Sequence, residues 1–139
     1  MFMRFLGVVG TTLMLAGSVA AQTTPAQSRE PVSGGRPLSE WIQDLTAPAP
    51  QTRNAAAYEI AGMGSAAAAA VPALIATLDD PIAAVRFPAV IALMEIGPAA
   101  KAAVPRLQQM EEEEINDEIA AAARRALRRI QAEAAPPPP

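Results

Sequence analysis

Apolar residues recur along the middle of the chain with the spacing of an amphipathic helix. Two stripes each occupy positions i, i+3, i+4 and i+7, which fall on one face of a helix. They are Leu38, Trp41, Ile42 and Leu45, and then Val71, Leu74, Ile75 and Leu78. The strict alternation of apolar and polar residues that marks a half-buried strand is absent. The pattern therefore predicts helices and no strands.

A second helix is predicted after the second stripe. Asp79-Asp80-Pro81 ends the preceding helix, with Asp80 suited to be an N-cap and Pro81 to be the first helical residue. The new helix is expected to run to Ile96 and to end at Gly97, because glycine commonly terminates helices. Pro88 lies inside it and should bend its axis.

The whole pattern repeats with an offset of 33 residues. Gly64-Ser65-Ala66-Ala67 recurs as Gly97-Pro98-Ala99-Ala100, Ala70-Val71-Pro72-Ala73-Leu74 recurs as Ala103-Val104-Pro105-Arg106-Leu107, and Arg53 recurs as Arg86. A third copy follows with one extra residue, which gives repeats at about 37–64, 65–97 and 98–132. Three copies are the minimum at which stacked helix pairs share a stable core. The predicted fold is all-α, a short α-solenoid of about three helix pairs.

These repeats resemble a known family. The strings DDPIAAVRFPAVIALMEIG (79–97) and IGPAAKAAVPRL (96–107) are similar to short HEAT repeats, including those of the phycobilisome lyase group. The ankyrin signature and the aromatic positions of tetratricopeptide repeats are missing. The resemblance covers about 100 residues and implies a scaffold that binds a partner along the ridge of its second helices.

The resemblance also implies a ladder of charged residues between repeats. In the family, an Asp before the second helix commonly pairs with an Arg inside it, and Asp80 with Arg86 match that pattern. Arg53 occupies the same position in the first copy. Ala47 and Ala120 stand where the remaining members would be, so we expect an incomplete ladder.

A candidate binding surface follows from the outward positions of the second helices. An apolar stripe on the middle helix comprises Phe87, Val90, Ile91 and Met94. Members of the family that the repeats resemble generally carry polar or charged residues at the positions of Phe87 and Ile91. Tyr58 aligns with Ile91 in the first copy, and Arg125 and Arg128 align with Ile91 and Met94 in the third. The ridge strip, defined as Tyr58, Phe87, Ile91, Met94, Arg125 and Arg128, would suit a peptide or helix with an apolar centre and an acidic end. The alternative is that neighbouring repeats, or a second copy of the protein, cover the stripe.

The last helix is strongly polarised in charge. Acidic residues Glu111–Glu114, Asp117 and Glu118 precede Arg124, Arg125, Arg128 and Arg129, an order that complements the helix dipole. The arginines either keep the end of the solenoid soluble or hold an acidic partner. A nucleic-acid partner is not expected, because the formal net charge of the chain is −3.

Composition argues against catalysis. The chain has no Cys and no His, so it lacks the usual general base, the thiol nucleophile and the commonest ligands of zinc, copper and iron. No serine or carboxylate forms a nucleophile–base pair in sequence, and neither a metal nor a cofactor is expected. Alanine contributes 33 of the residues, which favours thin, closely stacked helices over one deep core.

The two ends of the chain are expected to lie outside the folded domain of residues 37–135. Residues 1–21 carry Arg4, an apolar run and a small-residue end at Ala21, the pattern of a cleaved signal peptide; a retained membrane anchor is the alternative. Residues 22–36 read as a flexible leader and Pro136–Pro139 as a short polyproline tail. The protein is then expected in the bacterial periplasm or secreted, with no stable membrane insertion after cleavage.

Together these features predict an exported, non-catalytic scaffold that binds a protein or peptide through its ridge. Two alternatives remain at this point: a lyase-like or cofactor-handling auxiliary protein, and a structural module that closes a homodimer.

Overall fold

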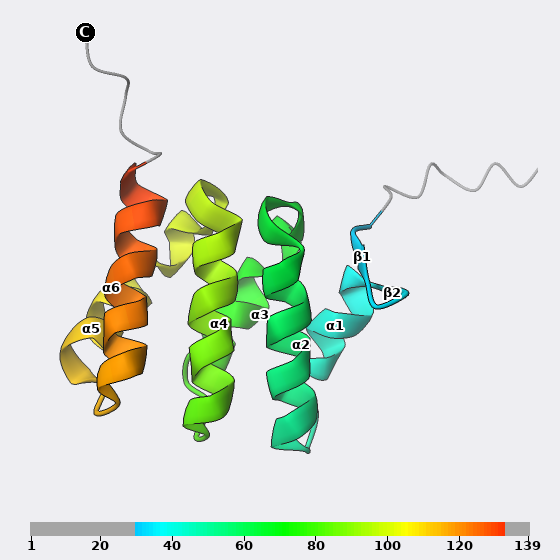
Figure 1. Cartoon of the computed structure of the whole chain (residues 1–139), viewed down its shortest axis with the longest axis horizontal. Helices are drawn as coiled ribbons and strands as arrows, with labels where there is room; N and C mark the ends of the chain where they lie inside the picture. The colour runs from blue at the N-terminus through cyan, green and yellow to red at the C-terminus, as the bar shows by residue number, and fades with distance from the viewer. Residues whose placement is uncertain (1–29, 133–139) are drawn as a thin grey trace, which may run out of the picture.

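The computed structural model describes residues 30–132 and arranges their helices in two layers (Figure 1). The elements are β1 (Val32–Ser33), β2 (Arg36–Pro37), α1 (Leu38–Asp44), α2 (Pro50–Gly62), the 3₁₀ helix η1 (Gly64–Ala70), α3 (Val71–Thr77), α4 (Ala83–Ile96), the 3₁₀ helix η2 (Gly97–Ala103), α5 (Val104–Glu113) and α6 (Asp117–Ala132). Helices α2, α4 and α6 stand side by side in one layer, with α1, α3 and α5 behind them. The predicted all-α solenoid of three helix pairs is confirmed.

Alanine allows the helices of the front layer to pack closely. Ala56 and Ala57 of α2, Ala89 and Ala92 of α4, and Ala122, Ala123 and Ala126 of α6 are completely buried. Larger side chains, including Ile60, Leu74, Leu93 and Leu107, fill the space between the two layers. Because a methyl group lets two helices approach closely but buries little area, the core is continuous along the row and thin across it.

A glycine with positive φ follows the last helical residue of the second helix in each of the first two repeats. Gly64 has a φ of 56° and Gly97 a φ of 75°, a region that glycine enters without steric cost. The predicted end of α4 at Gly97 is confirmed. Pro72 and Pro105 lie at the second positions of α3 and α5, where their missing N–H groups break no helical hydrogen bond.

The start of α4 differs from the sequence prediction. The helix begins at Ala83 and its N-cap is Ile82, so the prediction of Asp80 as N-cap and Pro81 as first helical residue is wrong by two residues. The Oδ1 of Asp80 accepts the Ile82 N–H at 2.9 Å while the same carboxylate binds Arg53. The carboxylate therefore holds the turn that precedes the helix.

Residues 30–37 pack against the first repeat and include the strands β1 and β2. The prediction of a flexible leader is therefore wrong for residues 30–36. The expectation that there are no strands is wrong for the same segment. Val32 pairs with Pro37 and Ser33 with Arg36 across a two-residue turn, Gly34-Gly35, with φ values of 58° and 77°. Two glycines at positive φ are typical of the tight turn that closes a hairpin.

Side-chain contacts attach this hairpin to the first repeat. The Trp41 indole N–H donates to the Ser33 carbonyl at 3.0 Å, and the Ser33 hydroxyl donates to Glu59 on α2. The Arg36 guanidinium lies 4.1 Å from the centre of the Trp41 ring, a cation–π arrangement. The hairpin therefore covers the N-terminal end of the helix row that the structure describes. The predicted signal peptide at 1–21 and the proline tail at 136–139 lie outside the described residues.

One run within the described residues, Ala83–Glu113, is long and apolar enough by length and composition to cross a membrane. It comprises α4, η2 and α5, and Gly97 interrupts its helical backbone. Half of its most apolar window is buried inside the fold, as in the core helices of many folded domains.

Candidate functional site

The outward faces of α2, α4 and α6 form a ridge along one side of the molecule (Figure 1). Phe87, Ile91 and Met94 project from α4, each half-buried and packed at the margin of the core. Val90, which the sequence pattern places on the same stripe, is completely buried. The centre of the ridge is therefore apolar but only partly covered by its own chain.

A shallow hollow crosses the ridge near the start of α4 and α6. Its volume is about 290 Å³ and its lining comprises Asn54, Tyr58, Ala83, Ala84, Phe87, Asn116, Glu118 and Ile119. The hollow brings together Tyr58, which is 49% exposed, and Phe87 from the next repeat. Ile91, Met94, Arg125 and Arg128 do not line it. Sequence reasoning missed Asn116 and Glu118, because only the stacking of α6 on α4 brings the α5–α6 turn next to Phe87.

The arginines of α6 fall into two groups. Arg124 binds Glu111 at 2.8 Å and Arg129 approaches Glu95 to 3.9 Å. Arg125 and Arg128 are exposed and form no ion pair with any residue of 30–132. These two, both members of the ridge strip, are available for a partner.

Arg53 links the first repeat to the second. Its Nε and Nη2 donate to the two oxygens of Asp80 at 2.6 and 3.1 Å. Its Nη1 donates to the carbonyls of Ala47 and Pro48 at 2.9 and 3.0 Å, in the turn that precedes its own helix. One side chain thus holds its own turn and that of the next repeat together.

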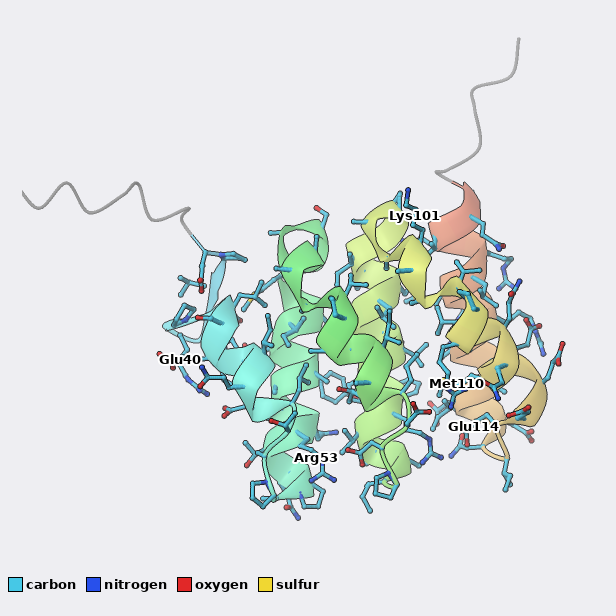
Figure 2. The ribbon with its side chains drawn as sticks, turned by 180° about the vertical axis from the view of Figure 1, so that it is seen from behind. Glu40, Arg53, Lys101, Met110 and Glu114 are labelled. Atoms are coloured by element: carbon cyan, nitrogen blue, oxygen red, sulfur yellow. The ribbon has the colours of Figure 1, made fainter. Side chains whose placement is uncertain are left out.

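Arg86 makes the equivalent set of contacts one repeat later. Its Nε and Nη2 each donate to Glu114 at 2.9 Å, and its Nη1 donates to the carbonyls of Asp80 and Pro81. The pairing of Arg86 with the Asp80 side chain, which the family pattern implied, is therefore wrong: Arg86 meets only the main chain of Asp80. Figure 2 shows Arg53 and Glu114 at the same edge of the molecule.

Both carboxylates of this ladder are shifted toward the charged form. Burial raises the pKa of the Asp80 carboxyl, but hydrogen bonds from Arg53 and the Ile82 N–H outweigh it and hold that pKa below its usual value. The Arg86 hydrogen bond lowers the pKa of Glu114 against the opposing effect of burial. The charged forms therefore stabilise the stacking of repeats.

The ladder also explains the two alanines that seemed to interrupt it. Ala47 stands where the first repeat would carry an acid, but no preceding repeat supplies an arginine to the described fold. Ala120 stands where the third would carry an arginine, but within residues 30–132 no following repeat supplies an acid. Glu114, the residue missed by sequence reasoning, corresponds to Asp80 once the extra residue of the third copy is counted.

A family model describing HEAT repeats matches residues 38–128. The chain belongs to the HEAT repeat family. The match spans all three helix pairs and supports HEAT repeats in general, without support for the phycobilisome lyase group. No curated protein and no solved structure shows a significant match.

The part of the HEAT domain that the structure describes carries no group of three Asp or Glu side chains placed to hold a metal ion. Every buried side-chain nitrogen and oxygen within residues 30–132 has a hydrogen-bond partner. The features that remain for function are the apolar centre of the ridge, the hollow beside it and the two exposed arginines.

Proposed function

We propose that this HEAT protein is an exported, non-catalytic scaffold that binds a protein partner through its ridge. The observation that carries the proposal is the apolar row of Phe87, Ile91 and Met94, which is only half-covered on the outward face of α4. HEAT repeats generally mediate protein–protein interaction, and a contiguous apolar patch on a folded surface commonly marks an interface.

The surroundings of the row support a protein partner over a small ligand. The hollow is shallow, and Tyr58 at its rim is the kind of aromatic residue enriched at interfaces. Arg125 and Arg128 add charge that no residue of 30–132 neutralises. An apolar centre with a charged margin is the usual composition of a protein interface.

The ridge is tested by photo-crosslinking in the producing cell. A crosslinkable residue in place of Ile91 should capture a discrete protein, and the same residue in place of the exposed Gln108 on α5 should not. Ile91→Glu should then abolish association with the captured protein while leaving the circular dichroism spectrum unchanged; Gln108→Glu is the matched charge control. Equal capture from both positions, or binding that survives Ile91→Glu, would refute the ridge as the interface.

Export is tested separately, by the mass of the isolated protein and by the cell compartment in which it is found. The protein isolated from the cell envelope or medium should lack about the first 21 residues, with the new terminus near Gln22. Recovery of the full-length chain from the cytosol would contradict export and leave the proposed ridge interface unaffected.

A further inference from the structure

Each of the three ridge helices presents a pair of residues at equivalent positions of the repeat. Residues seven apart face outward on α2 (Gln51 and Tyr58), on α4 (Ala84 and Ile91) and on α6 (Glu118 and Arg125). The three pairs are repeat equivalents, related by offsets of 33 and 34 residues. Each helix therefore presents a lower level near its N-terminus and an upper level two turns on, about 10 Å away.

The two levels are complementary in size and in charge. On α4 the lower residue is the small, exposed Ala84 beside the hollow, and the upper residue is the bulky Ile91. On α6 the lower residue is the acidic Glu118 and the upper is the basic Arg125. Neither side chain of this α6 pair forms an ion pair within residues 30–132.

We propose that the protein seated on the ridge is a second copy of this chain, packed antiparallel about a two-fold axis that crosses the helices midway between the two levels. The inference rests on the proposed function and names its partner. In this arrangement α4 faces α4 and α6 faces α6. Ile91 enters the space above the second copy's Ala84, Glu118 meets the second copy's Arg125, and each contact occurs twice.

The parallel two-fold arrangement does not give this complementarity. It would place α2 opposite α6 and each residue of α4 opposite its own equivalent. Ala84 would then face the second copy's Ala84 and leave the hollow unfilled, while Glu118 would face the neutral Gln51. A heterologous partner would not require this reciprocal matching of small with large and of acid with base on one surface.

A charge exchange tests the pairing on α6. The purified protein should sediment as a dimer, and Glu118→Arg or Arg125→Glu alone should each raise the dimer dissociation constant about tenfold or more, because each places like charges opposite one another twice. The double variant should restore the dimer. Single variants that leave dimerisation unchanged, or a double variant that fails to recover it, would overturn the inference. Circular dichroism checks that each variant keeps its helices.

Engineered cysteines test the register, since the chain has no native cysteine. A mixture of Ala84→Cys and Ile91→Cys copies should form an intermolecular disulfide on oxidation, and Ala84→Cys alone should not, because its two thiols would lie on opposite sides of the axis. Rapid cross-linking of Ala84→Cys alone would indicate the parallel arrangement and overturn the proposal. A protein that stays monomeric while Ile91 still captures another protein would refute the second copy and retain the ridge as an interface.

Discussion

The side-chain amide of Asn54 on α2 donates a hydrogen bond to the main-chain carbonyl of Ala84 on α4. Ala84 lies four residues before Pro88, which has no N–H to donate in the regular helical pattern. The carbonyl that the proline leaves free is therefore satisfied by the neighbouring repeat. Pro88, which sequence reasoning treated as a distortion of one helix, takes part in linking two repeats.

Asn54→Ala should therefore lower the free energy of unfolding by about 1 kcal/mol. In a Pro88→Ala background the same change should cost less, because the restored N–H of residue 88 supplies the Ala84 carbonyl with a helical donor. A double-mutant cycle from urea denaturation measures the difference. An equal cost in both backgrounds would show that the hydrogen bond is independent of the proline.

Loss of one ladder arginine should be strongly destabilising. The side chains of Arg53 and Asp80 are 14% and 8% exposed, so Arg53→Ala removes the charged donor of a nearly buried carboxylate, leaves it only the Ile82 N–H, and should cost about 2–3 kcal/mol. Arg106 and Asp79 form a matched control at a similar sequence separation, but they are 28% and 65% exposed, and Arg106→Ala should cost less than about 1 kcal/mol. Similar midpoints of urea unfolding for the two variants would contradict the ladder.

Acid should weaken the stacking of repeats through the same carboxylates. The pKa values of Asp80 and Glu114 are lower in the folded protein than in the unfolded chain, so the unfolded state takes up protons first as the pH falls. Their stabilisation is complete above the ordinary carboxyl pKa of about 4 and is lost progressively below it. Urea titrations between about pH 7 and pH 3 should show this loss, and it should be smaller in the double variant Asp80→Asn, Glu114→Gln. An unchanged pH dependence in that variant would assign the acid sensitivity to other groups.

Substitution by alanine should change the stability of the fold in opposite directions at two glycines. Gly97 has φ 75° and ψ −137°, a conformation that essentially only glycine adopts, so Gly97→Ala should destabilise the fold by about 1–3 kcal/mol. Gly62 closes α2 without a positive φ, and a Cβ there would meet no atom within 4 Å. Gly62→Ala should therefore stabilise by up to about 1 kcal/mol. Thermal unfolding gives both signs, and a destabilised Gly62→Ala would contradict this account of the helix end.

Many of the helices and helix ends can be predicted from the sequence, because the interactions that determine them are local. The apolar spacing from Leu38 to Leu45 predicts α1, and Gly97 predicts the end of α4, because helix periodicity and glycine conformation act over a few residues. The hairpin carries a local signal as well, the Gly34-Gly35 pair, but its strands are only two residues long and too short for alternation to show.

Only part of the candidate site can be predicted from the sequence. The outward positions of Phe87, Ile91 and Met94 follow from the turn of one helix, and the structure places them on the ridge as half-buried residues. Asn116 and Glu118 belong to the same hollow, yet no spacing within α4 points to them. Whether the ridge strip binds a partner stays a prediction.

The amino-acid order alone thus establishes the repeat, the helices and the family, since each follows from patterns within about one repeat length. The tertiary structure determines which charged groups form ion pairs. Arg53 binds Asp80, 27 residues away, and Arg86 binds Glu114, 28 residues away. The tertiary structure also brings Asn54 to the carbonyl that Pro88 leaves free. These contacts depend on how closely the alanine-lined helices approach and on the rotation of each helix pair relative to the preceding pair. Both are properties of the stacked repeats and not of a single repeat.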